Sequence, residues 1–437
     1  MVRISSFWPL VAVALLLSIF IGCGLDFESP NSATEGEVLS TRGGLYGLAI
    51  GLQQYYAANA LSSVILTPGT TTREVAVNTT FANLVELEAG GTPLLNNNGN
   101  TVGLWSGLFR VIKMADQVME GAASVPLDAA MQSGIMGLAL WHKAVAIGFL
   151  AQSFEQLPID VQMDGKAGFK TRAEAFAEAI RLLDQAIQVV KATPTNSEFK
   201  TKVLGSGFNL ENSLQAYRAR YSLLAGRYQE AITFATAVDP KVKSTFSYTT
   251  LTPNPIYQAV SVSKSYAPRD SFGITMAEPN DQRLAFYLSP NSVKSRPNNY
   301  PIDNLVGFWA SPTQSIPVYL PGEMNLIKAE AYVRLGDLAN ATTEINAVRT
   351  KKATADAFGI GASLPAYSGA ATVDALLTEI YRQRCSELFL NGLRFDDCRR
   401  LNRPAPPANM VERNRIFYPY PLQERQNNPS VPADPVI

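Results

Sequence analysis

The sequence predicts an all-α fold in which stacked helical hairpins carry an irregular lobe with a few short strands. Three observations support this prediction. Stretches such as residues 173–190 have apolar residues at helical spacing and no glycine or proline, which is typical of amphipathic helices. One helix-turn-helix pattern occurs twice, 110 residues apart. Eleven prolines fall within residues 239–323, which excludes long helices from that segment.

The composition is that of a folded globular protein with no excess of either charge. The chain of 437 residues has 37 Lys+Arg against 37 Asp+Glu, with 46% hydrophobic and 17% charged residues. A neutral surface disfavours nucleic acid as a partner, because such binding needs a basic field. His142 is the one histidine, so a metal site with two histidines is excluded. We expect no metal and no other cofactor.

An apolar run near the N-terminus has the length and position of a secretory signal. Residues 8–21 follow the positive charge of Arg3 and are fewer than the roughly 20 that span a bilayer. The run ends in Phe20-Ile21-Gly22-Cys23. A small residue directly before cysteine resembles a bacterial lipobox, with Phe20 where leucine is usual, and this implies acyl chains on Cys23. The alternative is an ordinary signal peptide in which the cysteine is a coincidence.

These features divide the chain into three parts. We expect a lipoprotein signal peptide (residues 1–22), a polar lipidated tether (23–40) and a single domain (41–437). The tether is rich in serine, glutamate and small residues, which suits a spacer. No later stretch reaches 18 unbroken apolar residues, so we expect the domain to be soluble.

Three segments ahead of the repeated pattern are predicted helices, namely residues 106–120, 136–154 and 173–190. A single hairpin cannot bury its own apolar face. We therefore expect the last two segments to pair and to stack beside the repeats.

The repeated pattern covers residues 214–238 and 324–348. In both copies the apolar residues recur at spacings that place them on one helix face. Gly226 and Gly336 are equivalent and can end the first helix of each pair in a left-handed conformation. The pattern resembles the tetratricopeptide repeat, so we expect a right-handed superhelical body. The matched positions are Leu214, Tyr217, Tyr221, Ala225, Tyr228, Ala231, Ala235 and Val238, and then Met324, Ile327, Ala331, Leu335, Leu338, Ala341, Ile345 and Val348.

Two segments lack helical periodicity. Residues 239–323 are rich in proline and aromatic residues and form the irregular lobe, inserted between the hairpins. A bare loop of this length is unusual in a compact domain, so a few short strands are expected there. We also expect an irregular course for residues 67–100, which include the polar run Asn96-Asn97-Asn98-Gly99-Asn100.

A final helix is predicted within residues 378–402, with Gly392 as its stop. Its apolar stripe consists of Leu377, Tyr381, Cys385 and Leu388. A position on this stripe favours a buried free thiol for Cys385, and a disulfide with Cys398 is the alternative.

Charged residues recur along the same segment. We interpret Glu387, Arg394 and Asp397 as a structural ion-pair network that ties the helix to the body. The alternative is a catalytic cluster. Asp396 and Asp397 are neighbours, so on a helix they point about 100° apart, which is a poor arrangement for an acid and a base.

Four features in this order resemble the SusD/RagB family of Bacteroidetes outer-membrane lipoproteins. They are the lipobox at Cys23, part of the second hairpin, the C-terminal helix and the tail. Trp105 and Asp116 also resemble the family's N-terminal helix. Gln383 and Asn391 depart from the family pattern, which weakens any claim about a subfamily. The matching residues are Ala329, Glu330, Ala331, Tyr332, Arg334, Leu335 and Gly336, then Arg384, Glu387, Leu388, Gly392, Arg394 and Asp397, then Tyr418, Pro419, Tyr420, Pro421, Glu424, Asn428 and Pro429.

The resemblance implies a helical body with an irregular lobe that presents the ligand site. It implies a protein anchored in the outer membrane at the cell surface, where it lies as a lid over a SusC-like TonB-dependent transporter. It further implies binding of oligosaccharides, or in some members peptides, without any chemistry.

A sugar-binding surface needs flat aromatic rings and planar polar side chains. The candidates are Trp309, Tyr300, Tyr287 and Tyr266 in the lobe, together with Arg73, Asn78 and the run Asn96–Asn98. For each aromatic the alternative is a place in the lobe core. Trp309 is the best single candidate. Trp105 and Trp141 lie in helical patterns and are expected in the core, and His142 is expected to be structural or at the surface.

Three functions are compatible with these observations. The favoured one is a non-catalytic surface lipoprotein that captures an oligosaccharide or peptide and delivers it to a transporter. The alternative is a tetratricopeptide-like lipoprotein scaffold that docks a protein or peptide partner on its hairpins. A surface hydrolase would need two carboxylates facing each other in a cleft, and nothing in the sequence favours it.

Overall fold

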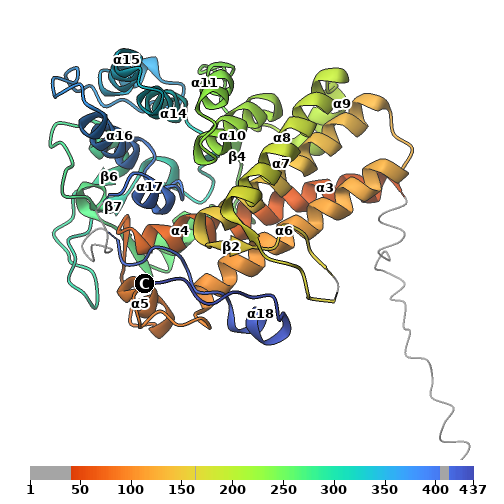
Figure 1. Cartoon of the computed structure of the whole chain (residues 1–437), viewed down its shortest axis with the longest axis horizontal. Helices are drawn as coiled ribbons and strands as arrows, with labels where there is room; N and C mark the ends of the chain where they lie inside the picture. The colour runs from red at the N-terminus through yellow and green to blue at the C-terminus, as the bar shows by residue number, and fades with distance from the viewer. Residues whose placement is uncertain (1–40, 163, 404–412) are drawn as a thin grey trace, which may run out of the picture.

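The computed structural model describes residues 41–162, 164–403 and 413–437. Cys23, the signal peptide and the tether lie outside this part of the chain. The predicted all-α class is confirmed, because long helices form the body and every strand in the described residues is two or three residues long. In Figure 1 the long helices lie on the right, the hairpins at the top and the irregular lobe on the left. The longer helices are α3 (Arg42–Tyr55), α4 (Leu61–Thr71), α6 (Gly99–Ser124), α7 (Ala129–Ser153), α8 (Arg172–Ala192), α10 (Leu210–Leu224), α11 (Tyr228–Thr236), α14 (Pro321–Arg334), α15 (Leu338–Arg349) and α16 (Val373–Glu387).

The repeated pattern forms two pairs of antiparallel helices, as predicted. Helices α10 and α11 make the first pair and α14 and α15 the second. Gly226 and Gly336 have φ angles of 73° and 83°, which glycine adopts without the strain that a side chain would cause. Ala231 and Ala341 are fully buried, as expected where paired helices approach closely. Helix α11 packs against α14 and α8 against α10, so the pairs join in one stack with α7 and α6.

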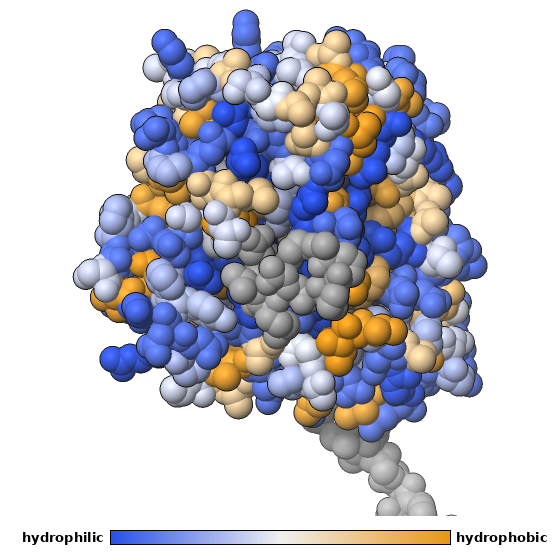
Figure 2. Space-filling view, turned by 60° about the vertical axis from the view of Figure 1, so that its left-hand side comes forward, coloured by the Kyte–Doolittle hydropathy of each residue, from blue (hydrophilic) through white to orange (hydrophobic). Residues whose placement is uncertain are grey.

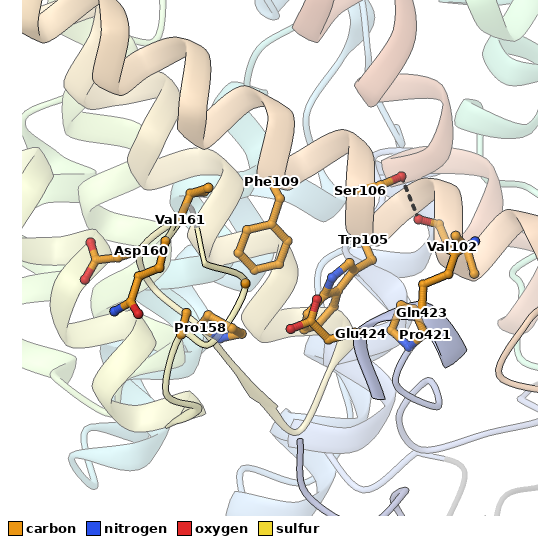
Figure 3. Close-up of a pocket in the computed structure, with 13 residues that line it drawn as sticks. Val102, Trp105, Ser106, Phe109, Pro158, Asp160, Val161, Pro421, Gln423 and Glu424 are labelled. Carbon is orange, nitrogen blue, oxygen red and sulfur yellow. Dashed lines mark hydrogen bonds between the residues drawn. The ribbon is translucent and has the colours of Figure 1, made fainter. Parts of the chain in front are cut away.

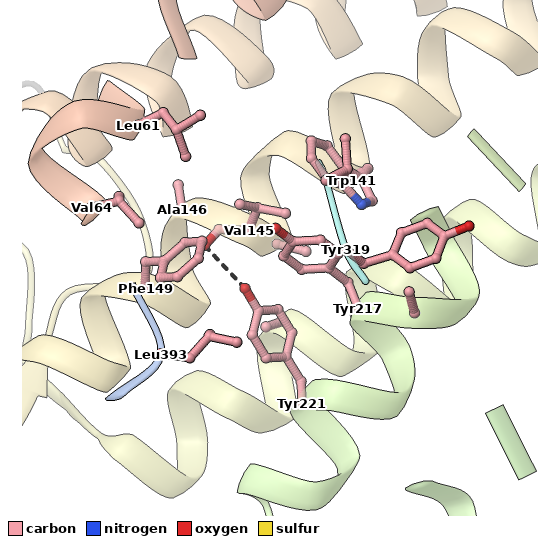
Figure 4. Close-up of a cluster of buried hydrophobic side chains, with 14 of the residues drawn as sticks. Leu61, Val64, Trp141, Val145, Ala146, Phe149, Tyr217, Tyr221, Tyr319 and Leu393 are labelled. Atoms are coloured by element: carbon pink, nitrogen blue, oxygen red, sulfur yellow. Dashed lines mark hydrogen bonds between the residues drawn. The ribbon is translucent and has the colours of Figure 1, made fainter. Parts of the chain in front are cut away.

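Helix α7 is the centre of this stack. It is long and apolar enough to cross a membrane by length and composition, but 94% of its most apolar stretch is buried inside the protein. Helix α10 approaches α7 closely at Gly148, where an added Cβ would lie 2.1 Å from Cζ of Tyr221. The hydroxyl of Tyr221 donates a hydrogen bond to the carbonyl of Val145 at 3.2 Å, and Trp141 and Tyr217 pack beside it (Figure 4). A residue without a side chain at position 148 therefore lets an aromatic ring reach the backbone of α7.

Local signals set where several of these helices begin. Asp128 accepts a hydrogen bond from the backbone N–H of Met131 at the start of α7. Thr171 and Glu174 form a reciprocal capping box at the start of α8. Such caps satisfy backbone N–H groups that have no partner inside the helix.

The expectation of an irregular course for residues 67–100 is wrong for much of that segment. Helix α4 continues through Pro68 to Thr71, a further helix α5 (Ala82–Ala89) follows, and α6 already begins at Gly99. All of α4 from Val64 to Thr71 is buried. The hydroxyl of Thr70 bonds to the carbonyl of Leu66 at 2.7 Å. Tertiary packing thus outweighs the local preference against helix at proline and threonine.

Gly392 does not stop the last predicted helix, since α16 ends five residues earlier, at Glu387. It lies instead in the turn before α17 (Arg394–Arg400), with a φ of 74°. An added Cβ there would lie 2.5 Å from the carbonyl oxygen of Val64 in α4. Glycine is therefore needed for the close approach of this turn to α4.

The lobe is irregular and held by short antiparallel strand pairs, as predicted. One pair matters most for the site, because it joins the lobe to the segment that follows α4. Figure 2 brings the lobe side forward and shows a face on which apolar and hydrophilic residues are interspersed. The pairs of the lobe are β1 (Val75–Val77) with β5 (Tyr266–Pro268), β4 (Thr245–Phe246) with β8 (Ile316–Pro317), and β6 (Leu288–Ser289) with β7 (Asn304–Leu305); outside the lobe, β2 (Gln156–Leu157) pairs with β3 (Lys170–Thr171).

Candidate functional site

Two of the predicted ligand-stacking rings lie inside the lobe. Trp309 is 1% exposed and Tyr287 is fully buried. Their rings stack with centroids 5.6 Å apart, and Phe389 packs against both. The structure therefore corrects the expectation that these two residues offer exposed rings. The physical reason is that a lobe with little regular structure uses its largest aromatics for a core of its own.

The other four candidates come together at the edge of the lobe. Strand β1 pairs with β5 so that Val77 lies opposite Tyr266, and the pairing continues as Asn78 N–H donates to the carbonyl of Ser265 at 2.8 Å. Arg73 is only 2% exposed and its guanidinium lies 5.5 Å from the ring centroid of Tyr300, so it supports this ring from inside the protein and does not offer hydrogen bonds to a ligand. Residues nearly 200 apart in the sequence thus form one surface.

Arg269 completes this group, although the sequence analysis did not single it out. It follows β5 directly, and its guanidinium lies 4.5 Å from the ring centroid of Tyr300. Its Nε donates to the carbonyl of Pro301 at 3.1 Å. We define the lobe-edge site as Arg73, Asn78, Tyr266, Arg269 and Tyr300. Tyr266 and Tyr300 are both half-buried, so each ring has one part fixed in the protein and another part open.

Hydrogen bonds hold the polar side of the lobe-edge site in place. Glu88 accepts from the backbone N–H of Val77 at 2.6 Å and from the amide of Asn298. Arg73 donates to the backbone carbonyl of Glu88 at 2.6 Å. Burial raises the pKa of Glu88 and lowers that of Arg73. Asn78 accepts a hydrogen bond from the backbone N–H of Arg296 at 3.3 Å. The site therefore offers planar polar groups whose positions are set in advance.

The asparagine run has a structural role at Asn98. Its side-chain oxygen accepts from the backbone N–H of Asn100 and caps α6. Its amide donates to the carbonyl of Asn83 at 2.8 Å and to Glu86 at 3.0 Å. Asn98 is only 2% exposed, so it supports the loop and does not offer hydrogen bonds to a ligand.

Phe81 is an aromatic that the sequence analysis missed. It lies three residues after Asn78, just before α5, and is 61% exposed. The available signal was a large apolar residue directly after the polar run Asn78-Thr79-Thr80. An exposed ring three residues from Asn78 is one more surface on which a sugar could stack.

Comparisons with known proteins give a family match for part of the chain and a match in fold for nearly all of it. Residues 311–430 match the family model of the SusD family. This segment contains the second hairpin, the C-terminal helices and most of the tail. The predicted resemblance to the SusD/RagB family is thus confirmed for residues 311–430. A comparison with curated proteins finds no match.

Solved structures extend the likeness in fold to nearly the whole chain. A SusD superfamily protein from Bacteroides thetaiotaomicron has 16% identity and a TM-score of 0.69, over 90% of this chain and 99% of the other. A SusD superfamily protein from Bacteroides vulgatus has 16% identity and a TM-score of 0.69, over 91% and 99%. A SusD-like carbohydrate binding protein from Bacteroides fragilis has 12% identity and a TM-score of 0.69, over 90% and 100%. At these identities the likeness shows the fold.

The SusD/RagB motif residues of the C-terminal helices join this fold together. Glu387 is fully buried and pairs with Arg283 at 3.0 Å and Lys351 at 2.5 Å. Burial alone would raise the pKa of Glu387, but these two cations outweigh it and lower the pKa. Arg394 lies 3.5 Å from Glu74 and donates to the carbonyl of Phe272. These contacts link the C-terminal helices to the lobe and to the segment after α4.

The remaining motif charges pair within the same region. Asp397 lies 2.7 Å from Nε of Arg384 and also pairs with Arg400. Each carboxylate of the predicted network is thus held by cations and is only slightly exposed. This arrangement suits a structural role better than catalysis, which needs a group that can exchange a proton with a substrate.

The two cysteines of the described residues are buried. Cys385 and Cys398 are free thiols, and burial raises the pKa of Cys398 to about 11, so neither is a reactive thiolate. Among the described residues no group of three or more His, Cys, Asp and Glu side chains is placed to hold a metal ion.

His142 is fully buried beside Trp141. Burial lowers its pKa to about 4, although a hydrogen bond to the carbonyl of Leu138 opposes the shift. The unfolded chain takes up a proton near pH 6.5, whereas the folded chain does not until about pH 4. Folding is therefore favoured above pH 6.5, and this advantage is lost as the pH falls.

We expect the wild type to lose about 2 kcal/mol of unfolding free energy through His142 between pH 6.5 and 4.5. The measurement is urea unfolding at several pH values for the wild type and for His142→Phe. Because Glu74 and Glu88 have raised pKa values and act in the opposite direction, the difference between the two proteins isolates the histidine. Identical pH dependence in both would contradict the prediction.

Proposed function

We propose that the chain is a non-catalytic cell-surface lipoprotein that captures an oligosaccharide at the lobe-edge site and delivers it to a TonB-dependent outer-membrane transporter. The match of residues 311–430 to the SusD family model supports this role. A structural relative from Bacteroides fragilis is described as a carbohydrate binding protein. The lipobox-like sequence at Cys23 supports anchoring by acyl chains in the outer membrane.

The chemistry of the lobe-edge site is the observation that carries the proposal. The ring of Tyr300 is half-buried, with the guanidinium groups of Arg73 and Arg269 near it. The amides of Asn78 and Asn298 lie at the rim, on the same surface. An aromatic ring can stack on the apolar face of a pyranose while planar polar groups bond its hydroxyls.

The same geometry disfavours hydrolysis at this site. Glu88 is buried next to it, and hydrogen bonds from Val77 and Asn298 occupy it. The side chain of Asp270 is 42% exposed, and its carboxylate lies 3.7 Å from Nε of Arg269. A glycoside hydrolase needs a pair of carboxylates that face the scissile bond across a space of about 5 to 10 Å. We therefore propose binding without turnover.

Tyr300→Ala is expected to weaken binding of oligosaccharides about tenfold or more, because the stacking surface is lost. The measurement is isothermal titration calorimetry of the purified chain with a panel of neutral and acidic oligosaccharides. Tyr332→Ala is the matched control, since Tyr332 is also half-exposed but lies on α14. It should bind like the wild type.

Other outcomes would redirect the proposal. Wild-type affinity of Tyr300→Ala for oligosaccharide would show that the lobe-edge site does not bind this ligand. Hydrolysis of a panel member would indicate a hydrolase. Binding of peptides alone would favour a peptide ligand or the scaffold on the helical hairpins.

A further inference from the structure

A separate cleft lies between α6, the segment that connects β2 to β3, and the C-terminal helix α18 (Leu422–Asn427). Its volume is about 320 Å³, which is at the lower end for ligand sites. Trp105 and Phe109 form its aromatic wall, with ring centroids 4.8 Å apart. Pro158 lies across from them and Glu424 comes from α18 (Figure 3). We call this space the α6 cleft.

The indole of Trp105 presents an unused hydrogen-bond donor to the α6 cleft. Trp105 is only 5% exposed, and contacts with Phe154, Phe169 and Tyr420 hold its ring. Its Nε1–H makes no hydrogen bond to any described residue, and Figure 3 shows it facing the cleft beside Glu424. The ring is held in place while its N–H stays open to solvent in the cleft, so this donor is available to the hydroxyl of a ligand.

Acceptors and an apolar surface surround this donor. Glu424 uses one carboxylate oxygen to accept from Asn428 at 2.9 Å, which orients the other oxygen. Asp160 and Gln162 also line the cleft, and the carboxylate of Asp160 lies 3.7 Å from Nζ of Lys143, which is not part of the lining. The described lining includes no lysine or arginine. Two carboxylates without a lining cation disfavour an anionic ligand.

We propose that the α6 cleft is a second saccharide site, for one neutral pyranose unit. A sugar hydroxyl is both donor and acceptor, so one hydroxyl can accept from Trp105 Nε1–H and donate to Glu424. The apolar face of the same ring packs on Phe109. The cleft is made by residues other than those of the lobe-edge site. It rests on the proposed function only for the class of ligand, and it would let one chain hold a long glycan at two points.

Trp105 itself supplies the readout. The full chain contains four tryptophans, so labelling with ¹⁵N-tryptophan gives few indole N–H signals in a TROSY spectrum. Trp105→Phe identifies the signal of Trp105. Trp141 donates to the carbonyl of Ser213 in the core and serves as an internal control. The probes are methyl α-glucopyranoside, maltotriose, cellotriose and, as the acidic comparison, galacturonic acid.

We expect at least one neutral probe to shift the Trp105 signal saturably while the Trp141 signal stays in place. Glu424→Gln should weaken that binding about tenfold, because it replaces a charged acceptor by an amide. Glu120→Gln, the same change at an exposed position of α6, should have no effect.

Three results would overturn the inference. They are a Trp105 signal that no neutral probe moves at tens of millimolar, a shift that is unchanged in Glu424→Gln, and tighter binding of galacturonic acid than of neutral sugars. Calorimetry of Tyr300→Ala distinguishes this failure from that of the proposed function. If saccharide binding depends on Tyr300 but does not shift the indole N–H signal of Trp105, the second site is refuted while the proposed function stands.

Discussion

Glu387→Ala is expected to lower the free energy of unfolding by about 3–5 kcal/mol, the usual cost of removing one partner from a buried ion pair. Glu387 is fully buried, and its two oxygens pair with Arg283 and Lys351 at 3.0 and 2.5 Å. Arg283 keeps Asp281 as a partner and Lys351 keeps Asp356. Without the carboxylate of Glu387, Arg283 and Lys351 nevertheless have less negative charge to compensate them in a buried environment that water does not reach. The measurement is urea unfolding followed by circular dichroism.

Glu198→Ala is the matched control for this variant. Glu198 pairs with Lys202 one helical turn away, and the two side chains are 45% and 57% exposed. Water and salt screen such a pair, so its removal should change stability little. Equal losses in the two variants would show that burial of the Glu387 network contributes nothing to the cost.

Trp309→Ala is expected to destabilise the protein by about 3–5 kcal/mol, because it leaves a large cavity in the lobe core. Trp309 is 1% exposed and stacks on Tyr287, which in turn donates a hydrogen bond to the carbonyl of Glu387 at 3.0 Å. The cavity would therefore loosen the contact between the lobe and α16. Thermal and urea unfolding measure the loss.

Two further variants separate this packing role from ligand binding. Trp309→Phe keeps an aromatic ring in the core and should bind saccharide within about twofold of the wild type. Phe81→Ala removes an exposed ring and should change the free energy of unfolding by less than about 0.5 kcal/mol. If Trp309→Phe kept the wild-type stability but lost saccharide binding, Trp309 would have a role in ligand binding that packing in the lobe core does not explain.

Much of the helical body could be predicted because its signals are local. The spacing of apolar residues in 214–238 and 324–348 repeats with the period of a helix, and glycine marks each turn. The paired helices follow directly from that pattern. Pro68 shows the limit of local rules, since a buried environment keeps α4 helical through it.

The sequence by itself determined the fold class, the two hairpins and the irregular character of the lobe. Only the tertiary structure decided which aromatics face solvent. Tyr300 and Trp309 both lie among prolines in the same lobe, yet one is half-buried beside Arg73 and Arg269 and the other lies in the core. Burial depends on which distant segments meet, as β1 and β5 do. Helical periodicity is set by neighbours three and four residues away, whereas contacts across 200 residues leave no comparable pattern in the sequence.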